Sequence, residues 1–81
     1  MYVSLGMGKY ERAEDIIGIF DLDITSQSRI TMNYLNTREK AGKIRNAAED
    51  IPKTFVVTGA GDVYLSGPAA TTLIKRIEEQ V

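Results

Sequence analysis

The chain has 81 residues, 43% of them hydrophobic and 26% charged, a balance typical of one small globular domain rather than a disordered segment or a coiled coil. Ten Lys and Arg against eleven Asp and Glu leave a formal charge of -1, so the strongly basic composition of many nucleic-acid binders is missing. The sequence has no Cys and no His, which excludes disulfides, thiolate or imidazole metal ligands and the commonest catalytic base. We therefore expect no enzyme, no metal, no cofactor and no small-molecule substrate.

The first half of the chain predicts three strands and a helix. Residues 2–5 are β-prone, and residues 9–13 form a polar, edge-like second strand after Gly6-Met7-Gly8. Residues 16–20 place apolar side chains on both faces of an extended segment, which predicts a central strand covered on both sides. A helix over about 26–41 follows, with a narrow apolar stripe and with Gly42 as its C-terminal stop.

The second half of the chain predicts three further strands and a second helix. Residues 44–47 form a short strand, and residues 54–58 and 62–66 form a β-hairpin around Gly59-Ala60-Gly61. A helix over about 68–79 begins with Pro68 in its first turn, and its apolar face runs from Ala70 to Val81. The predicted fold is a single α+β domain, residues 1–81, with a small, mostly antiparallel sheet of about five or six short strands, two helices and assembly into an oligomer.

The location of the protein is predicted from its apolar runs. The N-terminus lacks the basic and long apolar regions of a signal peptide, and the longest apolar-rich run, residues 16–20, is far short of the roughly 20 residues that a membrane helix needs. We expect a cytoplasmic protein with no membrane partner. Because so small a domain buries a limited fraction of its surface, homo-oligomerisation is the expected source of further apolar burial.

Neither the glycines nor the acids form a recognisable site. The two Gly-containing segments do not open a helix directly after a strand, so they are interpreted as turns and not as phosphate loops. The acidic residues lack the pattern of a calcium loop and are interpreted as a solvated rim or as partners of a helix N-terminus. These residues are Glu11, Glu14, Asp15, Asp21 and Asp23.

Charge is distributed unevenly along the chain. Residues 11–23 carry five acids and one base, whereas residues 29–45 carry five bases and one acid. This division has three interpretations that the sequence leaves open: solvated surfaces, a head-to-tail contact between the acidic edge of one protomer and the basic helix of the next, or a local phosphate-binding patch.

The order of several segments resembles the small bacterial extracellular-matrix regulators of the RemA/RemB family, most closely the RemB-like branch. The likeness covers nearly the whole chain, although no single segment is specific. The matching segments are residues 1–6, 15–21, 52–58 and 62–66, and residues 72–73 with 75–76. The resemblance implies a cytoplasmic, non-enzymatic regulator of biofilm-matrix genes that assembles into rings, and in the RemA branch such rings bind DNA.

The resemblance also shows where this chain departs from the RemA pattern. Arginines implicated in DNA binding in that branch fall at Asp15 and at Asp50-Ile51 here, and only the basic position at Lys53 is kept. Acids at these positions repel phosphate, which weakens the expectation of DNA binding by the RemA route. The alternative is a protein-interaction scaffold that binds no nucleic acid.

Two sets of candidate residues follow from the charge pattern and the resemblance. Contacts to DNA phosphates, without readout of bases, are expected from Arg29, Lys43, Arg45 and Lys53, with Arg12 as a weaker candidate. The oligomer interface is expected at Asp21, Asp23, Arg38 and Lys40. Partners are therefore further copies of the chain and DNA, or a protein in place of DNA.

Overall fold

The computed structural model describes residues 1–22 and 28–79. Within these residues it has six strands, a short 3-10 turn and two helices. In chain order they are β1 (Tyr2–Gly6), β2 (Lys9–Arg12), η1 (Ala13–Asp15), β3 (Ile16–Asp21), α2 (Arg29–Lys40), β4 (Ile44–Ala47), β5 (Thr54–Thr58), β6 (Val63–Ser66) and α3 (Ala70–Glu78).

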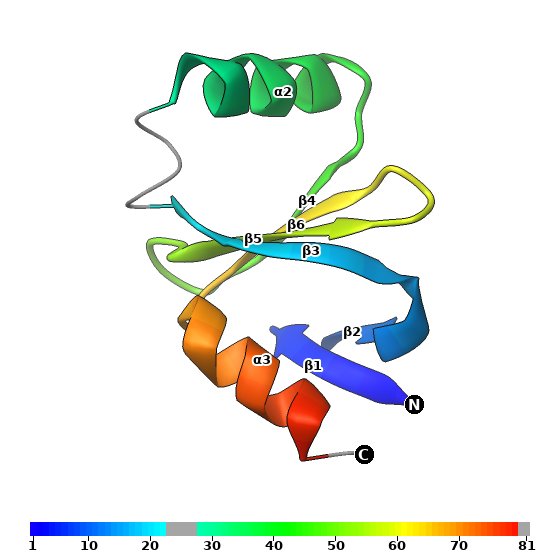
Figure 1. Ribbon diagram of the computed structural model, residues 1–81. Helices are drawn as coiled ribbons and strands as arrows, with labels where there is room; N and C mark the ends of the chain where they lie inside the picture. Colours follow the sequence, from blue (N-terminus) through cyan, green and yellow to red (C-terminus); the bar gives the residue numbers. More distant parts are fainter. Residues whose placement is uncertain (23–27, 80–81) are drawn as a thin grey trace.

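These elements stack in three layers (Figure 1). A four-stranded sheet of order β3-β5-β6-β4 forms the middle layer; α2 lies over one face, and α3 lies with the β1–β2 hairpin over the other. The strands pair antiparallel except for β4, which runs parallel to β6. The predicted α+β class and the six short strands are confirmed, but the strands form two sheets and not one, because β1 and β2 pair only with each other.

The core lies between the four-stranded sheet and the layer of α3 and β1. Alternation along β1 points Val3 and Leu5 inward, where they meet Val56 of β5 and Leu73 of α3, all completely buried. Burying one such side chain contributes about 1.5–3 kcal/mol. The Ser66 hydroxyl donates to the Leu5 carbonyl oxygen at 2.5 Å, so the central sheet is also held to β1 by a buried hydrogen bond.

The prediction that residues 16–20 form a central strand is wrong. The centre of the sheet is occupied by β5 and β6, and β3 is its outermost strand on one side. Two apolar side chains of β3 remain exposed on the α2 face, Ile17 by 71% and Phe20 by 41%. An apolar pattern on both faces is shared by central strands and by edge strands whose outer face meets a helix or another chain, so the pattern alone could not separate them.

The two predicted helices are confirmed with shorter boundaries. Helix α2 ends as expected: Gly42 has φ +72°, its N–H donates to the Glu39 carbonyl, and the Lys43 N–H donates to the Arg38 carbonyl, which is a Schellman cap. Helix α3 begins at Ala70 and not at residue 68, because the Pro68 carbonyl accepts a hydrogen bond from the Thr54 hydroxyl at 2.7 Å outside the helix. The expected start of the first helix near residue 26 and the apolar position Val81 lie outside the described residues.

Candidate functional site

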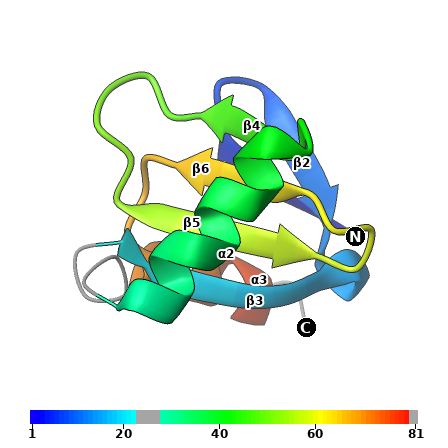
Figure 2. The same cartoon turned by 90° about the horizontal axis from the view of Figure 1, so that it is seen from above.

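The strands that the acidic and basic segments contribute to the four-stranded sheet lie at its opposite edges. Strand β3, which belongs to the acidic segment, is outermost on one side, and β4, which belongs to the basic segment, is outermost on the other. Seen from above, α2 crosses the sheet diagonally from the end of β3 toward the start of β4 (Figure 2). The basic C-terminal turn of α2 therefore lies on the β4 side, away from the acids that flank β3.

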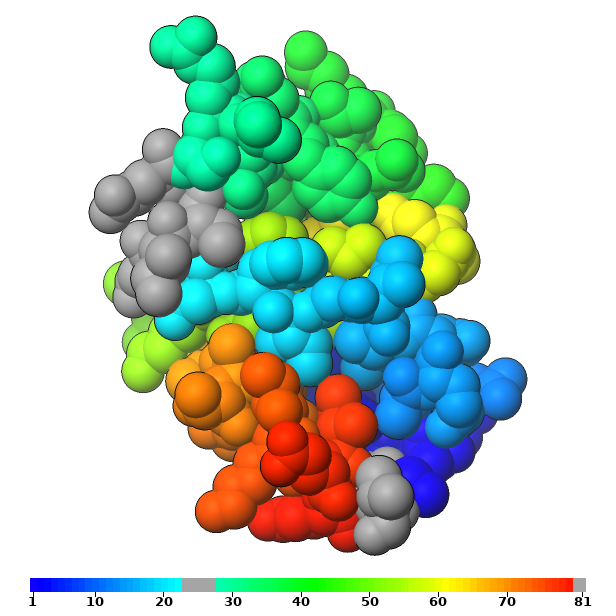
Figure 3. Space-filling view, in the orientation of Figure 1, coloured from blue at the N-terminus to red at the C-terminus, as the bar shows by residue number. Residues whose placement is uncertain are grey.

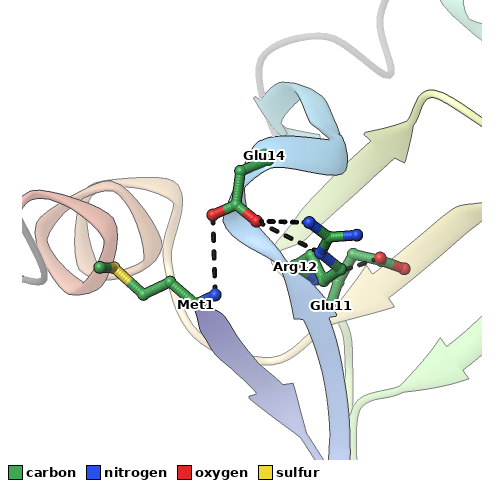
Figure 4. Close-up of polar contacts among 4 residues, drawn as sticks. All are labelled: Met1, Glu11, Arg12 and Glu14. Atoms are coloured by element: carbon green, nitrogen blue, oxygen red, sulfur yellow. Dashed lines mark hydrogen bonds and ion pairs between the residues drawn. The ribbon is translucent and has the colours of Figure 1, made fainter.

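The acidic edge is formed by the residues at the two ends of β3. Asp15 directly precedes the strand and is exposed, and Asp21 is its last residue. Glu14 is partly neutralised, since its carboxylate lies 3.7 Å from the N-terminal amine and 3.3 Å from Arg12 (Figure 4). Glu11 lies apart from this edge, beside Tyr64 of β6, and the interface candidate Asp23 lies outside the described residues.

The basic edge is formed by Arg38 and Lys40 at the end of α2 together with Lys43 and Arg45. The Arg38 guanidinium lies 5.5 Å from the centre of the Tyr34 ring, an arrangement that orients it as a cation–π pair. A Cβ at Gly61 would lie 3.2 Å from the Arg38 Nη1, so Arg38 also reaches the β5–β6 turn. In the same turn, Asp62 forms an ion pair with Arg45 at 3.6 Å.

The five residues predicted to contact phosphate are not brought together within one protomer. Arg29 begins α2 and Lys43 follows its C-terminal cap, so the two lie at opposite ends of a helix about 18 Å long at 1.5 Å per residue. Arg12 and Arg45 each form an ion pair with a carboxylate. Within residues 1–22 and 28–79, no ion pair involves Arg29, Lys43 or Lys53.

An apolar groove separates α2 from the sheet and opens at the β3 edge. It has a volume of about 350 Å³, and Phe20 and Phe55 stack on its sheet side with their ring centres 4.9 Å apart. Ile17 of β3 and Ile30 of α2 line it, and Ile30 is 82% exposed. Figure 3 shows β3 crossing this side of the molecule between α2 and α3. Sequence reasoning missed this groove; the one available signal was the apolar character of both faces of β3.

A second groove, of about 580 Å³, lies between the β1–β2 turn and the loop of residues 48–53. Its lining includes Met7, Glu49, Asp50, Ile51 and Lys53. Lys53, a candidate for phosphate binding, therefore shares a groove with two carboxylates, which weaken its attraction for an anion. Sequence reasoning did not find this groove either, because its walls come from distant parts of the chain.

Tyr64 forms a small polar cluster between β2, β4 and β6. Burial raises the pKa of its hydroxyl above the ordinary value of 10.0, and the nearby carboxylates of Glu11 and Asp62 raise this pKa further, whereas Arg45 acts in the opposite direction. The hydroxyl donates a hydrogen bond to Glu11. The fold therefore favours the neutral form of Tyr64.

No arrangement of metal ligands is present in the described part of the chain, where no group of three or more Asp or Glu side chains could hold an ion. Neither described helix is long and apolar enough to cross a bilayer.

Comparison with known proteins adds no assignment, since no protein-family model and no curated protein matches the chain. The candidate site is therefore defined by its two charged edges and two grooves.

The Tyr64 cluster predicts a loss of stability at high pH. Because the pKa of Tyr64 is higher in the folded than in the unfolded chain, the contribution of this residue is complete below about pH 10 and is lost as the pH rises through the folded-state pKa. In Tyr64→Phe, the free energy of unfolding should fall less steeply above about pH 10 than in the wild type. Urea unfolding at a series of pH values measures both slopes. The exposed-site control Tyr10→Phe should keep the wild-type slope, and equal slopes in all three proteins would contradict the assignment.

Proposed function

We propose that the chain is a non-enzymatic, cytoplasmic regulatory protein of the extracellular-matrix regulator type, which acts as a ring-like homo-oligomer. The regulatory role follows from the sequence resemblance. The observation that carries the assembly is the position of β3 and β4 at opposite edges of one sheet, with acids at the first edge and bases at the second. A contact between two different surfaces of the same molecule is heterologous, and repetition of such a contact closes a ring when the rotation between protomers allows it. Complementary charge favours contact of the acidic edge of one protomer with the basic edge of the next.

The β3 edge offers both backbone and apolar groups to a neighbour. Leu22 donates its N–H to the Lys53 carbonyl, and Phe20 is paired with Phe55, so the backbone groups of these β3 residues face β5. The backbone N–H and C=O groups of successive residues point to alternate sides of an antiparallel strand. Those of Ile19 therefore face the outer edge of the sheet. An edge of this kind can pair with another chain.

The groove under α2 supports assembly through its apolar lining. Ile17 of β3 and Ile30 of α2 both line the groove and have most of their surface exposed to water, so the groove is open at the β3 edge. A neighbour that covers this side removes both side chains from solvent, which contributes about 25 cal/mol for each Å² of apolar surface buried. Charge thus determines which edges meet, and burial of apolar surface stabilises their contact.

DNA binding is the second part of the proposal, and it depends on the assembly. Arg29, Lys43 and Lys53 form no ion pair within the described residues, so their charges are available to phosphates. One protomer spreads these cations over its surface, but a ring repeats each of them, and many weak contacts then act on one DNA molecule. Contacts of this kind bind the backbone and read no sequence.

The alternative function, a protein-interaction scaffold without a nucleic-acid role, is favoured by one observation. Asp50 and Ile51, at the positions that the RemA resemblance gives to arginines, line a groove with an acidic wall and exposed apolar side chains. Such a surface suits a protein better than a phosphate backbone.

Charge exchange between the two edges tests the assembly. Lys40→Glu places an acid at the basic edge, and Asp15→Lys places a base at the acidic edge. Each variant alone should assemble about thirtyfold more weakly per contact at low salt, since an attraction of up to about 1 kcal/mol becomes a repulsion of similar size. An equimolar mixture should assemble again, because each junction between the two different variants pairs opposite charges. Light scattering measures the particle mass in each sample.

Lys75→Glu, an exposed charge reversal on α3, serves as the matched control and should assemble like the wild type. Assembly of Lys40→Glu with wild-type strength would contradict the head-to-tail contact. A mixture that stays dissociated would show that the two edges do not face each other.

DNA binding is tested by fluorescence polarisation with a labelled duplex at about 50 and 200 mM salt. The wild-type affinity should fall steeply between the two concentrations. In Lys43→Ala the loss of a phosphate contact should make this fall less steep, because about one counterion fewer is released when the DNA binds. Arg12→Ala is the control, because Arg12 is already paired with Glu14 and should contribute little. Absence of binding at about 50 mM salt would refute the DNA part and favour the scaffold.

A further inference from the structure

We propose that the groove between the β1–β2 turn and the 48–53 loop is a docking site for a short segment of a partner protein, one that carries a Lys or Arg beside an apolar side chain. The inference goes beyond the proposed function: of the residues that line the groove, only Lys53 is also a candidate for DNA contact, and the docking argument rests on the other side chains. Three features carry it: an exposed methionine held in an unfavourable backbone conformation, a floor of small residues, and an acidic wall.

The first feature is Met7, at the tip of the β1–β2 hairpin. Gly6 pairs with Lys9, so Met7 and Gly8 form a two-residue turn, with φ +51° and +70°. Turns with positive φ at both central residues favour Asn or Gly at the first of them, because a side chain without a local hydrogen bond is strained in this region. Met7 is the only residue other than glycine with positive φ among those the structure describes, and its side chain is 54% exposed. Turn formation does not explain a methionine here, whereas contact with a partner does.

The second feature is the shape of the groove between Met7 and Ile51. Ile51 projects from the 48–53 loop with 79% of its surface exposed, and both side chains line the groove. The uncharged remainder of the lining is formed by small or compact residues, Gly6, Ala47, Gly67 and Pro68. A Cβ at Gly6 would lie 2.4 Å from the Ala47 carbonyl oxygen, so the turn approaches the end of β4 as closely as the backbone permits. A lining of small and compact side chains lets an extended peptide approach the backbone, and the two exposed apolar side chains can contact that peptide.

The third feature is charge. Glu49 and Asp50 line the groove and are exposed, and Lys53 is the single basic residue in its lining. The excess of negative charge attracts a cationic side chain and repels a nucleic-acid backbone. A segment with a basic residue next to an apolar one satisfies both the acidic wall and the two apolar side chains.

The groove is separate from the proposed assembly surfaces. No residue of β3 or α2 lines it, and the one residue that it shares with β4, Ala47, is 1% exposed and lies in the core. Head-to-tail contact between the sheet edges therefore does not require these side chains. A ring would present one such groove on every protomer, which strengthens binding of a partner that carries several copies of the segment.

A phage-displayed library of random dodecapeptides, selected against the full chain, provides the test. The selected peptides should be enriched in Lys or Arg within two positions of Leu, Ile, Met or Phe. In titrations with the three most enriched synthetic peptides, Ile51→Ser and Asp50→Lys should each weaken binding by about tenfold or more, as loss of a central contact does. Met7→Asn should also weaken binding, although Asn suits the turn better, so this loss cannot come from unfolding. Ile74→Ser on α3, also an exposed isoleucine, is the matched control and should leave binding unchanged.

Four outcomes of these experiments would contradict the proposal. It is overturned if the library yields no peptide that binds the wild type more tightly than Asp50→Lys, or if the selected peptides lack the basic residue. Binding that is equal in the wild type, Met7→Asn and Ile51→Ser places the peptide elsewhere. If Met7→Asn and Ile51→Ser weaken binding of a labelled duplex but not of the peptides, the groove binds nucleic acid instead.

Discussion

The arrangement of the whole molecule depends on the β5–β6 hairpin at the centre of the sheet. Val56 is completely buried, and Phe55 is buried on the opposite face, so this hairpin supports both outer layers. Because the two central positions are taken, β3 and β4 can only add at the outside, one on each side. The acids at the two ends of β3 and the bases at the end of α2 and on β4 thereby lie on opposite sides of the sheet. A different strand order would place the same charges side by side, where they would neutralise each other.

The two faces of the sheet differ in how well they are covered. On one face, β1 and α3 bury a continuous apolar cluster and add hydrogen bonds such as that from Arg76 to the Ser4 carbonyl at 2.8 Å. On the other face, α2 has no fully buried side chain, and an open groove remains beneath it. A domain of this size has little stability in reserve, so the incompletely covered face is the surface that gains most from a neighbour. The fold and the proposed assembly thus have the same physical origin.

Local signals in the sequence predicted most of the elements but not their neighbours. The hairpin followed from Gly59-Ala60-Gly61 between two β-prone runs, and the end of α2 followed from Gly42, because both depend on backbone conformation within a few residues. The position of β3 did not follow, since an edge strand under a helix has the same apolar pattern as a central one. The pairing of Arg12 with Glu14 and the groove between Met7 and Ile51 could not be predicted, because they depend on tertiary contacts or side-chain geometry.

Native mass spectrometry of the wild-type chain at low ionic strength tests the central claim most directly. A closed, head-to-tail assembly has one size, because the angle between neighbouring protomers fixes the number of chains. The account predicts a single dominant particle of more than two chains that dissociates as the salt concentration rises. A monomer under all conditions would contradict it. A symmetric dimer would contradict it equally, since a two-fold contact joins identical surfaces and leaves the division of charge between the two edges without a role.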